Sequence, residues 1–261
     1  MSADGRTELS VIAACYNEQD NVAELVRRTL AALDANGIGG ELVLVDDGSS
    51  DATWTCIEEA MQRDGRVRGV RHLKNRGIEG GWHSGLALAR GDLVCLIDSD
   101  LQNRPEDITR LYEAYGRERP DVVQAVRHTQ GVRSRAVFSR GLNHLLNVAF
   151  GMNLRDNKSG FLLCSRDVLR ELLRHRFRYR YFQSFIGAAC GVRHYRVAEV
   201  DTGFEPRRAG KSFLSDYPIV VSLRICGELL KYRLETLPTQ LRGADCRASA
   251  RSQPEWPTRL R

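Results

Sequence analysis

Two groups of acidic residues, each directly after an apolar run, have the types and spacing to do chemistry. Asp46 and Asp47 follow the run Leu42–Val45. The triplet Asp98–Asp100 follows the run Leu93–Ile97 in the same way. Like charges gathered at one place repel unless a cation or hydrogen-bond donors neutralise them. In an Asp-x-Asp turn two carboxylates can converge on one divalent ion, and hard oxygen ligands suit Mg²⁺ or Mn²⁺. Because this spacing is also common in turns and helix caps, it leaves a metal site and an ordinary turn equally open.

The segments that must position these carboxylates alternate between short apolar runs and helical patterns. Expected strands cover Leu9–Ala14, Glu41–Val45, Val67–His72, Asp92–Ile97 and Asp121–Val126, and expected helices cover Asp20–Leu33, Asp51–Met61, Gly81–Arg90 and 105–116. Strands that alternate with helices predict parallel pairing in a doubly wound α/β sheet. Ligands bind outside the carboxyl ends of the strands in such sheets, and both acidic groups fall at these ends.

After residue 130 the pattern changes. Helices are predicted over Ser134–Gly151 and Asp167–Leu173, a short strand over Val197–Val200 and a basic, glycine-containing loop over Arg207–Ser212. No internal repeat is found. The second half therefore does not continue the regular strand–helix alternation of the first.

A last, amphipathic helix is predicted over Pro218–Leu237. Its apolar side is predicted to carry Ile219, Leu223, Cys226 and Leu230. Its charged residues exclude a membrane span. Burial of the apolar side against the domain is the default interpretation, and a helix lying on a membrane surface is the alternative.

Composition limits the class of protein. A chain of 261 residues is long enough for one large α/β domain, alone or with a small appendage. The net charge of +6 indicates either simple solubility or an anionic partner, such as a phosphorylated substrate or a membrane surface. We expect no nucleic-acid partner, because no nucleic-acid-binding motif accompanies the charge. The seven scattered cysteines favour neither a disulfide framework nor a structural zinc site, which fits a reducing, cytoplasmic location. The N-terminal segment MSADGRTELS does not have the pattern of a signal peptide.

Four strings of residues carry a resemblance to a known family. They are AACYNE at 13–18, VDDGSSDAT at 45–53, NRGIEGGWHSGLALARGD at 75–92 and DSDLQNRPED at 98–107. Their order, spacing and place at strand ends resemble family 2 glycosyltransferases of the GT-A fold. The resemblance implies a Rossmann-like, doubly wound, mostly parallel sheet in a single domain, with the amphipathic helix after it.

The resemblance also implies a nucleotide-sugar donor, a UDP- or GDP-sugar, at the carboxyl edge of the sheet. The residues implied to hold the donor are Ala13, Tyr16, Glu18, Asp46, Asp47, Gly77, Asp98 and Ser99. Asp98, Asp100 and Gln102 are implied to bind Mg²⁺ or Mn²⁺ together with the diphosphate. The glycine-rich segment 77–85 is interpreted as letting the backbone approach the nucleotide, as forming a tight strand-to-helix turn, or both. It is not a dinucleotide fingerprint, because Glu79 stands where the second glycine is required.

Within that family the chain is most similar to polyprenyl-phosphate (dolichol-phosphate) sugar transferases. The similarity continues through DVVQAVR at 121–127, SRAVFSRGLN at 134–143, DNKSGF at 156–161 and RRAGKS at 207–212. In that subfamily arginines and a serine grip the acceptor phosphate, and the matching positions are Arg127, Arg135, Ser139 and Arg207. With Asp100 they form the predicted catalytic set. Guanidinium groups match phosphate oxygens in geometry and charge, which supports this assignment.

A phosphate acceptor is already an anion at neutral pH and needs no general base, whereas an alcohol would need one. We therefore expect a hexosyltransferase that works by a single in-line displacement with inversion, assisted by the metal. Two alternatives stay open. One is an enzyme of the same fold with a soluble acceptor, either phosphorylated or a natural product. The other is a non-catalytic nucleotide-binding module, against which Asp98 and Asp100 argue.

The expected organisation follows from these assignments. It comprises a tail at 1–8, a GT-A domain at 9–215 with a nucleotide-sugar half at 9–127 and an acceptor half at 128–215, the amphipathic helix at 216–238 and a disordered tail at 239–261. Peripheral association with the inner face of a membrane and homo-oligomerisation are left open.

Overall fold

The computed structural model describes residues 7–127, 141, 143–144, 147–148, 153–157, 159–175, 179–205 and 218–242. Three of the predicted acceptor residues, Arg135, Ser139 and Arg207, lie outside this part of the chain. So do most of the predicted helix Ser134–Gly151, the loop Arg207–Ser212 and residues 243–261.

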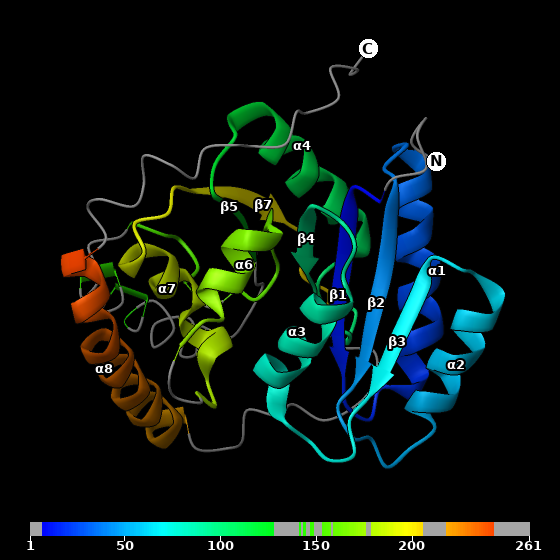
Figure 1. Cartoon of the computed structure of the whole chain (residues 1–261), viewed down its shortest axis with the longest axis horizontal. Helices are drawn as coiled ribbons and strands as arrows, with labels where there is room; N and C mark the ends of the chain where they lie inside the picture. The colour runs from blue at the N-terminus through cyan, green and yellow to red at the C-terminus, as the bar shows by residue number, and fades with distance from the viewer. Residues whose placement is uncertain are drawn as a thin grey trace.

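Within the described residues one sheet of seven strands runs through the molecule (Figure 1). Its strands are β1 (Leu9–Cys15), β2 (Gly40–Asp46), β3 (Val67–Arg71), β4 (Leu93–Leu96), β5 (Val122–Arg127), β6 (Leu162–Ser165) and β7 (Val197–Thr202), in the order β3-β2-β1-β4-β6-β5-β7. β6 runs antiparallel to both of its neighbours, and the other pairs are parallel. The predicted doubly wound, mostly parallel α/β sheet is confirmed.

Helices cover both faces of this sheet (Figure 1). One face packs on α1 (Gln19–Ala35), α2 (Thr53–Arg63) and α4 (Ile108–Glu118), and the short helix η1 (Pro105–Asp107) leads into α4. The other face packs on α3 (Gly77–Leu88), α6 (Arg166–Leu172), η2 (Phe182–Phe185), α7 (Ile186–Val192) and α8 (Pro218–Arg242). Successive strand residues point to opposite faces, so Val11 and Ala13 join the first core while Ile12 joins the second. Parallel strands buried in this way read as unbroken apolar runs, which is why the sequence revealed them.

The six cysteines in the described part of the chain are all free thiols. Four of them, Cys15, Cys95, Cys164 and Cys190, are buried in the two cores. The seventh cysteine, Cys246, lies outside the described residues, so the expected absence of a disulfide framework stays a prediction.

Strand β6 was not predicted. Its residues Leu162–Cys164 follow Phe161 in a short apolar run, which is too short to be recognised by periodicity. Its hydrogen-bond partners are β4 and β5, which lie far away in the sequence. The strand therefore becomes evident only when the chain is folded.

Helix α3 begins four residues earlier than predicted, at Gly77 instead of Gly81. A side chain on Gly81 would come within 2.6 Å of Ala14 Cβ, and one on Gly85 would collide with Ile12 Cγ2. The glycines therefore allow α3 to lie close to β1, and this packing outweighs the low helix propensity of glycine. The segment 77–85 is thus helical, and Gly77, with φ of 81°, begins it.

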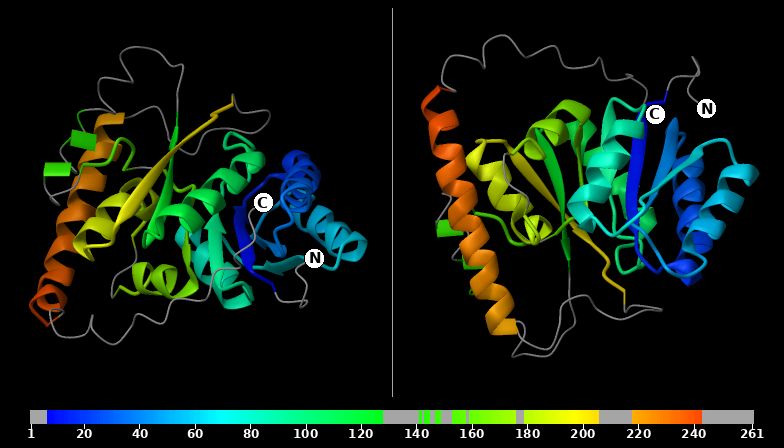
Figure 2. Two further views of the ribbon diagram at one scale, coloured as in Figure 1. Left: turned by 90° about the horizontal axis from the view of Figure 1, so that it is seen from above. Right: turned by 60° about the horizontal axis from the view of Figure 1, so that its bottom comes forward.

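Helix α8 buries a different side from the one predicted. Leu223 and Leu230, assigned to the buried side, are 69% and 60% exposed. Ile225, Leu229 and Tyr232 are buried instead, because they meet the second core. The helix also runs beyond the predicted end, to Arg242. It lies along the side of the molecule remote from α1 and α2 (Figure 2). Of the helices described here, none is long and apolar enough to cross a bilayer.

Candidate active site at the carboxyl edge of the sheet

The carboxyl ends of β1, β2, β4 and β5 lie at one edge of the sheet. Cys15 pairs with Asp46 in the register of β1 and β2. Ile12 pairs with Leu96, the last residue of β4, and Arg127 pairs with Thr202 at the ends of β5 and β7. The two acidic groups and Arg127 therefore come to the same edge, as the strand pattern predicted.

The loops after β1 and β2 are hydrogen-bonded to each other. Asn17 adopts a left-handed conformation with φ of 55°. Its backbone N–H donates to Ser49 Oγ at 2.9 Å, and its side-chain oxygen accepts from the Ser50 N–H at 2.9 Å. The Glu18 N–H donates to Thr53 Oγ1 at 2.8 Å. This bonding holds Tyr16, which is 46% exposed, at the rim, whereas Ala13 is buried inside β1.

Asp46 and Asp47 are both buried and bonded to protein groups. Asp46 accepts a hydrogen bond from the Ser49 N–H at 2.9 Å and forms an ion pair with Arg71 at 3.1 Å. Asp47 accepts from the backbone N–H groups of Arg76 and Gly77, both at 2.8 Å. These contacts hold the turn of β2 against the segment that enters α3. The predicted contacts of both aspartates with a donor stay a prediction.

A histidine completes the environment of Asp47. His72 Nδ1 lies 2.7 Å from Asp47 Oδ1, and its Nε2 lies 2.8 Å from Ser84 Oγ. An ionised carboxylate only accepts hydrogen bonds, so in this contact the Nδ1–H group of His72 donates to Asp47 Oδ1. No role was predicted for this histidine. Its spacing from Asp47 and Ser84 follows no motif, so the sequence contained no signal for it.

The carboxylate of Asp98 is held by two side-chain amides. Asn103 Nδ2 donates to Asp98 Oδ2 at 2.9 Å, and Gln183 Nε2 donates to Asp98 Oδ1 at 2.9 Å. Asn103 lies five residues further along the chain, whereas Gln183 belongs to η2 in the second half. Sequence reasoning missed Gln183, because nothing in its surroundings pointed to this contact.

The rest of the DSDLQ turn is tightly wound. Ser99 Oγ donates to the Ala14 carbonyl at 2.9 Å, and Asp100 Oδ1 accepts from the Gln102 N–H at 3.1 Å. Leu101 is buried and has φ of 60°, an unusual conformation for a bulky residue that proteins tend to keep at functional sites. The Gln102 carbonyl accepts from the Glu205 N–H at 2.8 Å, which joins the turn to the segment after β7.

Arg127 lies within electrostatic reach of both acidic residues of this turn. Its Nε and Nη2 donate to the two oxygens of Asp156, at 2.7 and 3.1 Å, and its guanidinium lies 5.6 Å from the centre of the Phe204 ring. Burial acts to lower the pKa of Arg127, but the bond to Asp156 and the charges of Asp156, Asp98 and Asp100 outweigh it and raise the pKa. The predicted acceptor arginine is thus held, permanently charged, beside the predicted metal turn.

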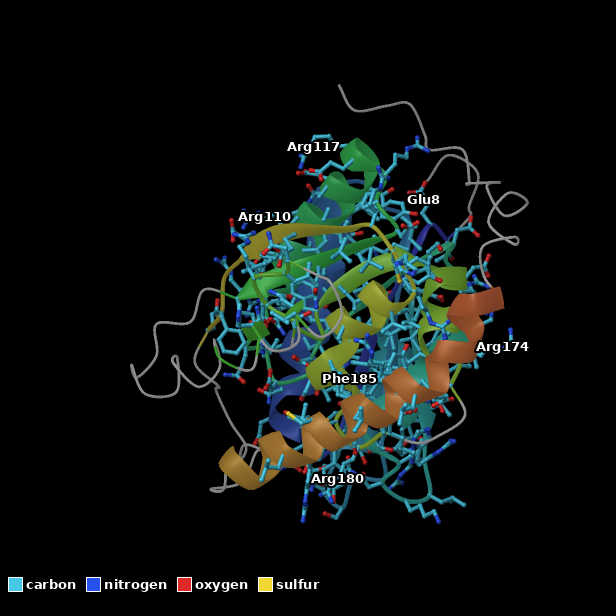
Figure 3. All side chains as sticks on the ribbon, turned by 90° about the vertical axis from the view of Figure 1, so that its left-hand side faces the viewer. Glu8, Arg110, Arg117, Arg174, Arg180 and Phe185 are labelled. Atoms are coloured by element: carbon cyan, nitrogen blue, oxygen red, sulfur yellow. The ribbon has the colours of Figure 1, made fainter. Side chains whose placement is uncertain are left out.

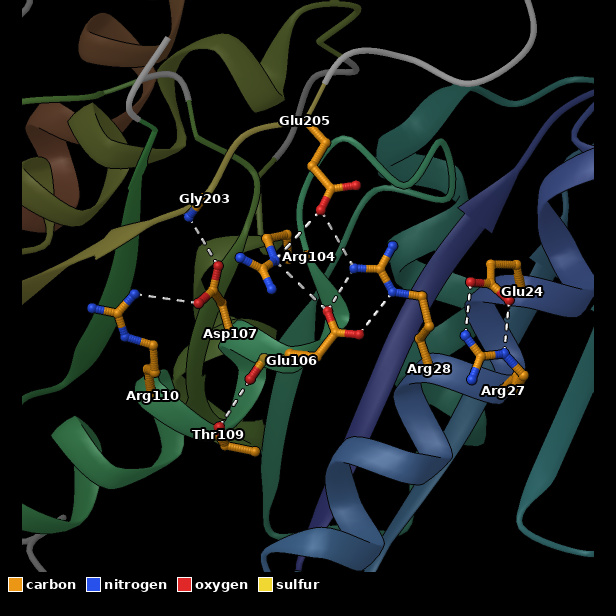
Figure 4. Close-up of polar contacts among 10 residues, drawn as sticks. All are labelled: Glu24, Arg27, Arg28, Arg104, Glu106, Asp107, Thr109, Arg110, Gly203 and Glu205. Carbon is orange, nitrogen blue, oxygen red and sulfur yellow. Dashed lines mark hydrogen bonds and ion pairs between the residues drawn. The ribbon is translucent and has the colours of Figure 1, made fainter. Parts of the chain in front are cut away.

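A cluster of charged residues supports the exit of this turn (Figure 4). Arg28 of α1 forms two hydrogen bonds to Glu106, at 2.8 and 2.6 Å, and lies 3.7 Å from Glu205. Asp107 accepts a hydrogen bond from the Gly203 N–H at 2.9 Å. The start of η1, the end of β7 and α1 are therefore tied together directly behind the turn.

The side chains of this turn fit a divalent cation of the Mg²⁺ or Mn²⁺ type. Asp98, Asp100 and Gln102 offer carboxylate and amide oxygens, and Mg²⁺ is commonly held by one or two carboxylates plus substrate phosphates. No group of three or more His, Cys, Asp or Glu that could hold a metal occurs in the described ranges. The oxygen donors of this turn are of the kind that Mg²⁺ and Mn²⁺ prefer.

Two curated relatives of this chain have the same name. A transferase of Edwardsiella ictaluri, undecaprenyl-phosphate 4-deoxy-4-formamido-L-arabinose transferase, is 42% identical over 151 residues, which are 57% of this chain and 46% of the relative. The transferase of that name from Shewanella sediminis is 35% identical over 206 residues, 78% of this chain and 61% of the relative. The chain thus spans about half to three fifths of the length of these relatives.

Solved structures show the same fold at lower identity. Glucosyl-3-phosphoglycerate synthase from Mycobacterium tuberculosis, crystallised with Mn²⁺, UDP-glucose and phosphoglyceric acid, superposes with a TM-score of 0.62. It is 23% identical, and the match covers 86% of this chain and 79% of that one. TarS of S. aureus superposes with a TM-score of 0.52 at 18% identity, covering 74% of this chain and 58% of that one.

The match to a protein family covers both acidic groups and extends into the second half of the chain. A family model described as "Glycosyl transferase family 2" matches residues 10–173. This range is more than half of the 261 residues and contains the edge at which Asp46, Asp98 and Arg127 meet. The chain therefore belongs to glycosyl transferase family 2.

Proposed function

We propose that this chain is an inverting, metal-assisted hexosyltransferase that moves a sugar from a nucleoside-diphosphate sugar to a polyprenyl-phosphate-type acceptor. The observation that carries the proposal is the meeting of the Asp98–Asp100 turn with Arg127 at one edge of the sheet. Such an edge can hold a dication through its carboxylates and an anionic nucleophile through its arginine. The names of the curated relatives support the choice of a polyprenyl-phosphate acceptor.

On the donor side, Asp98, Asp100 and Gln102 would hold Mg²⁺ or Mn²⁺ with the diphosphate. The cation would stabilise the charge that develops on the departing nucleoside diphosphate. Tyr16 and Glu18, on the loop after β1, would contact the base and ribose. The interlocked loops around Asn17 and Ser49 would keep that side of the site in place.

On the acceptor side, Arg127 would orient the attacking phosphate. Its guanidinium is held in place by the bond to Asp156, and its raised pKa keeps it charged at every physiological pH. Arg135, Ser139 and Arg207 are assigned to the same phosphate by the resemblance. Because that phosphate is already an anion, the proposed displacement needs no general base.

A transfer assay tests both sides of the proposal. Labelled UDP- and GDP-sugars are offered with polyprenyl phosphate and Mn²⁺, and the label is followed into an organic-extractable product. Asp100→Ala is expected to abolish transfer while leaving the melting temperature close to that of the wild type. Label that stays in the aqueous phase would favour a soluble acceptor, and full transfer by a folded Asp100→Ala variant would remove the metal assignment.

We further propose that the protein works in the cytoplasm, at the inner face of an anionic membrane on which α8 lies. Leu223, Leu230 and Leu234 form an exposed apolar row along the helix, spaced at seven and four residues. Arg224, Lys231 and Arg233 are exposed beside this row. An apolar row flanked by cations is complementary to a surface of anionic lipid.

Sedimentation with vesicles tests this second proposal. Wild-type protein is expected to bind phosphatidylglycerol vesicles, and to bind pure phosphatidylcholine vesicles less well. A Leu230→Asp, Leu234→Asp variant is expected to lose binding, whereas Leu73→Asp, at another exposed leucine, is expected to keep it. Equal binding by both variants, or a leucine-dependent dimer without vesicle binding, would contradict the proposal.

A further inference from the structure

Asp98 is oriented by neutral donors that come from opposite parts of the chain. One oxygen accepts from Asn103 Nδ2 and the other from Gln183 Nε2, each at 2.9 Å. A carboxylate oxygen can accept more than one hydrogen bond, so these two contacts do not exhaust the acceptor capacity of the group. Amide donors therefore fix the plane of the carboxylate and still leave it able to bind a cation.

The hydrogen-bond donors to Asp98 differ in charge from the donor to Asp156. Asp156 meets a guanidinium, and the two opposite charges cancel each other. Asp98 accepts hydrogen bonds from two neutral amides, which orient the carboxylate without adding an opposite charge. At the same edge, Asp156 is thus paired with a cation, whereas Asp98 is oriented by neutral amides.

The Gln183 side chain packs directly against the backbone at Gly160. A Cβ on Gly160 would lie 2.6 Å from Gln183 Nε2 and 2.9 Å from its Cγ. Gly160 stands just before β6, the strand that pairs with β4, and Asp98 follows β4. The absence of a side chain at Gly160 therefore lets Gln183 reach Asp98 across the sheet edge.

Helix α8 fixes the start of the helical turn that carries Gln183. The Glu228 carboxylate accepts hydrogen bonds from the backbone N–H groups of Arg180 and Tyr181, at 3.0 and 2.9 Å. On either side of Gln183, Phe182 and Phe185 are fully buried in a ring cluster with Tyr232 of α8. Figure 3 shows Phe185 and Arg180 on the side of the molecule along which α8 runs. The position of the Gln183 amide is therefore set from the C-terminal helix.

We infer that Gln183 is a positioning residue for the metal-binding carboxylate of Asp98, with Gly160 providing the space for its amide. The inference rests on the proposed function, because it assumes that Asp98 takes part in binding a cation with a nucleoside diphosphate. It assigns to η2, outside the sequence motifs of the donor site, a direct effect on cation affinity. Removing a partner that orients a metal ligand typically lowers metal affinity about 10- to 100-fold.

Binding of Mn²⁺ in the presence of saturating UDP or GDP tests the inference without any transfer reaction. Free Mn²⁺ is measured by electron paramagnetic resonance for the wild type, Gln183→Met and Gly160→Ala. Gln183→Met keeps the length of the side chain but removes the donor, and Gly160→Ala displaces the intact amide. Both variants are expected to bind Mn²⁺ about 10-fold more weakly. In the transfer assay they should raise the KM of the donor and leave the KM of the acceptor unchanged.

Ser184→Ala, the next position in η2, is the matched control and is expected to bind Mn²⁺ like the wild type. Melting temperatures show whether each variant is folded, and either Gln183→Met or Gly160→Ala alone is sufficient if the other does not fold. Wild-type affinity in both folded variants would overturn the inference and leave the proposed function standing. So would an equal loss in Ser184→Ala. If the wild type binds no Mn²⁺ with either nucleotide, the proposed metal-assisted function fails as well.

Discussion

The charged side chains at the carboxyl edge differ in the groups to which they are hydrogen-bonded. Asp47 is surrounded by two backbone N–H groups and His72, and Asp98 by two amides. Arg127 forms an ion pair with Asp156, and the charges of Asp98 and Asp100 also act on it. An incoming phosphate would therefore compete with Asp156 for the same guanidinium. In the proposed reaction, this ion pair would hold the Arg127 guanidinium in place until the acceptor phosphate arrives.

Replacing Asp156 by Asn tests this competition. The change leaves the largely buried Arg127 without its charged partner, so we expect a loss of stability on the order of 2–4 kcal/mol. An added anion can then take the place of the lost carboxylate. Millimolar pyrophosphate is expected to raise the melting temperature of Asp156→Asn more than that of the wild type. An equal shift in both proteins would mean that anions do not reach Arg127.

The Arg28–Glu106 pair predicts a dependence of stability on pH. The hydrogen bond from Arg28 lowers the pKa of Glu106 below its ordinary value of 4.5. The contribution of the pair is therefore fully present above about pH 4.5 and is lost as the pH falls through the lowered pKa of the folded state. Glu106→Gln should lower the urea midpoint at pH 7, and the difference from the wild type should shrink in acid.

Because the Glu106 side chain is 44% exposed, water screens this effect and only its direction is predicted. Glu24→Gln is the control, since Glu24 pairs on the same helix with Arg27, which is 67% exposed (Figure 4). Its urea midpoint should stay close to that of the wild type throughout. A difference for Glu106→Gln that grows in acid would contradict the assignment.

Among the elements, α3 shows how packing can overrule local propensity. Glycine is a poor helix former, yet α3 contains four glycines in its first nine residues. Two of them, Gly81 and Gly85, face β1 so closely that a methyl group has no space. The close approach brings Ser84 to His72, and His72 to the turn after β2. The glycine-rich segment therefore positions the turn after β2, on the proposed donor side, through helix packing.

Gly85→Ala is expected to destabilise the protein by about 1–3 kcal/mol, because the added methyl group collides with Ile12 and overpacking outweighs the gain in helix propensity. Gly227→Ala in α8 is the matched control, since nothing lies within 4 Å of its Cβ position. That variant should be neutral or more stable by up to about 1 kcal/mol. Chemical denaturation of both variants measures the difference. A stabilised Gly85→Ala would show that α3 can move away from β1 at no cost.

Across the whole molecule, the two halves of the chain share one sheet and one edge. β6 and β7, from the second half, pair with β4 and β5 from the first. Tyr232 of α8 joins His175, Tyr179, Phe182 and Phe185 in a cluster of rings. Glu235 accepts a hydrogen bond from the Tyr179 hydroxyl at 2.7 Å. The C-terminal helix is therefore part of the structure that supports the site.

Tyr232→Ala is expected to cost roughly 3–5 kcal/mol, because it empties the centre of this ring cluster. The loss should appear as one cooperative transition at lower denaturant, whether followed by far-UV circular dichroism or by fluorescence. Leu234→Ala, on the exposed side of α8, should change the midpoint little. Separate transitions in the two signals would mean that α8 unfolds independently of the sheet.

The amino-acid pattern was sufficient for the order and type of the elements up to β5 and for the edge at which the acidic groups meet. These features depend on local periodicity and on the strand–helix alternation, which a sequence displays directly. Strand β6, the start of α3 and the buried side of α8 could not be found in this way. Each of them depends on residues distant in the chain. β6 needs its partners β4 and β5, α3 packs on Ile12 and Ala14 of β1, and α8 packs on the ring cluster of η2. The same holds for the partners of the site, His72 for Asp47 and Gln183 for Asp98, because a side-chain contact across 25 or 85 positions leaves no periodic trace in the sequence.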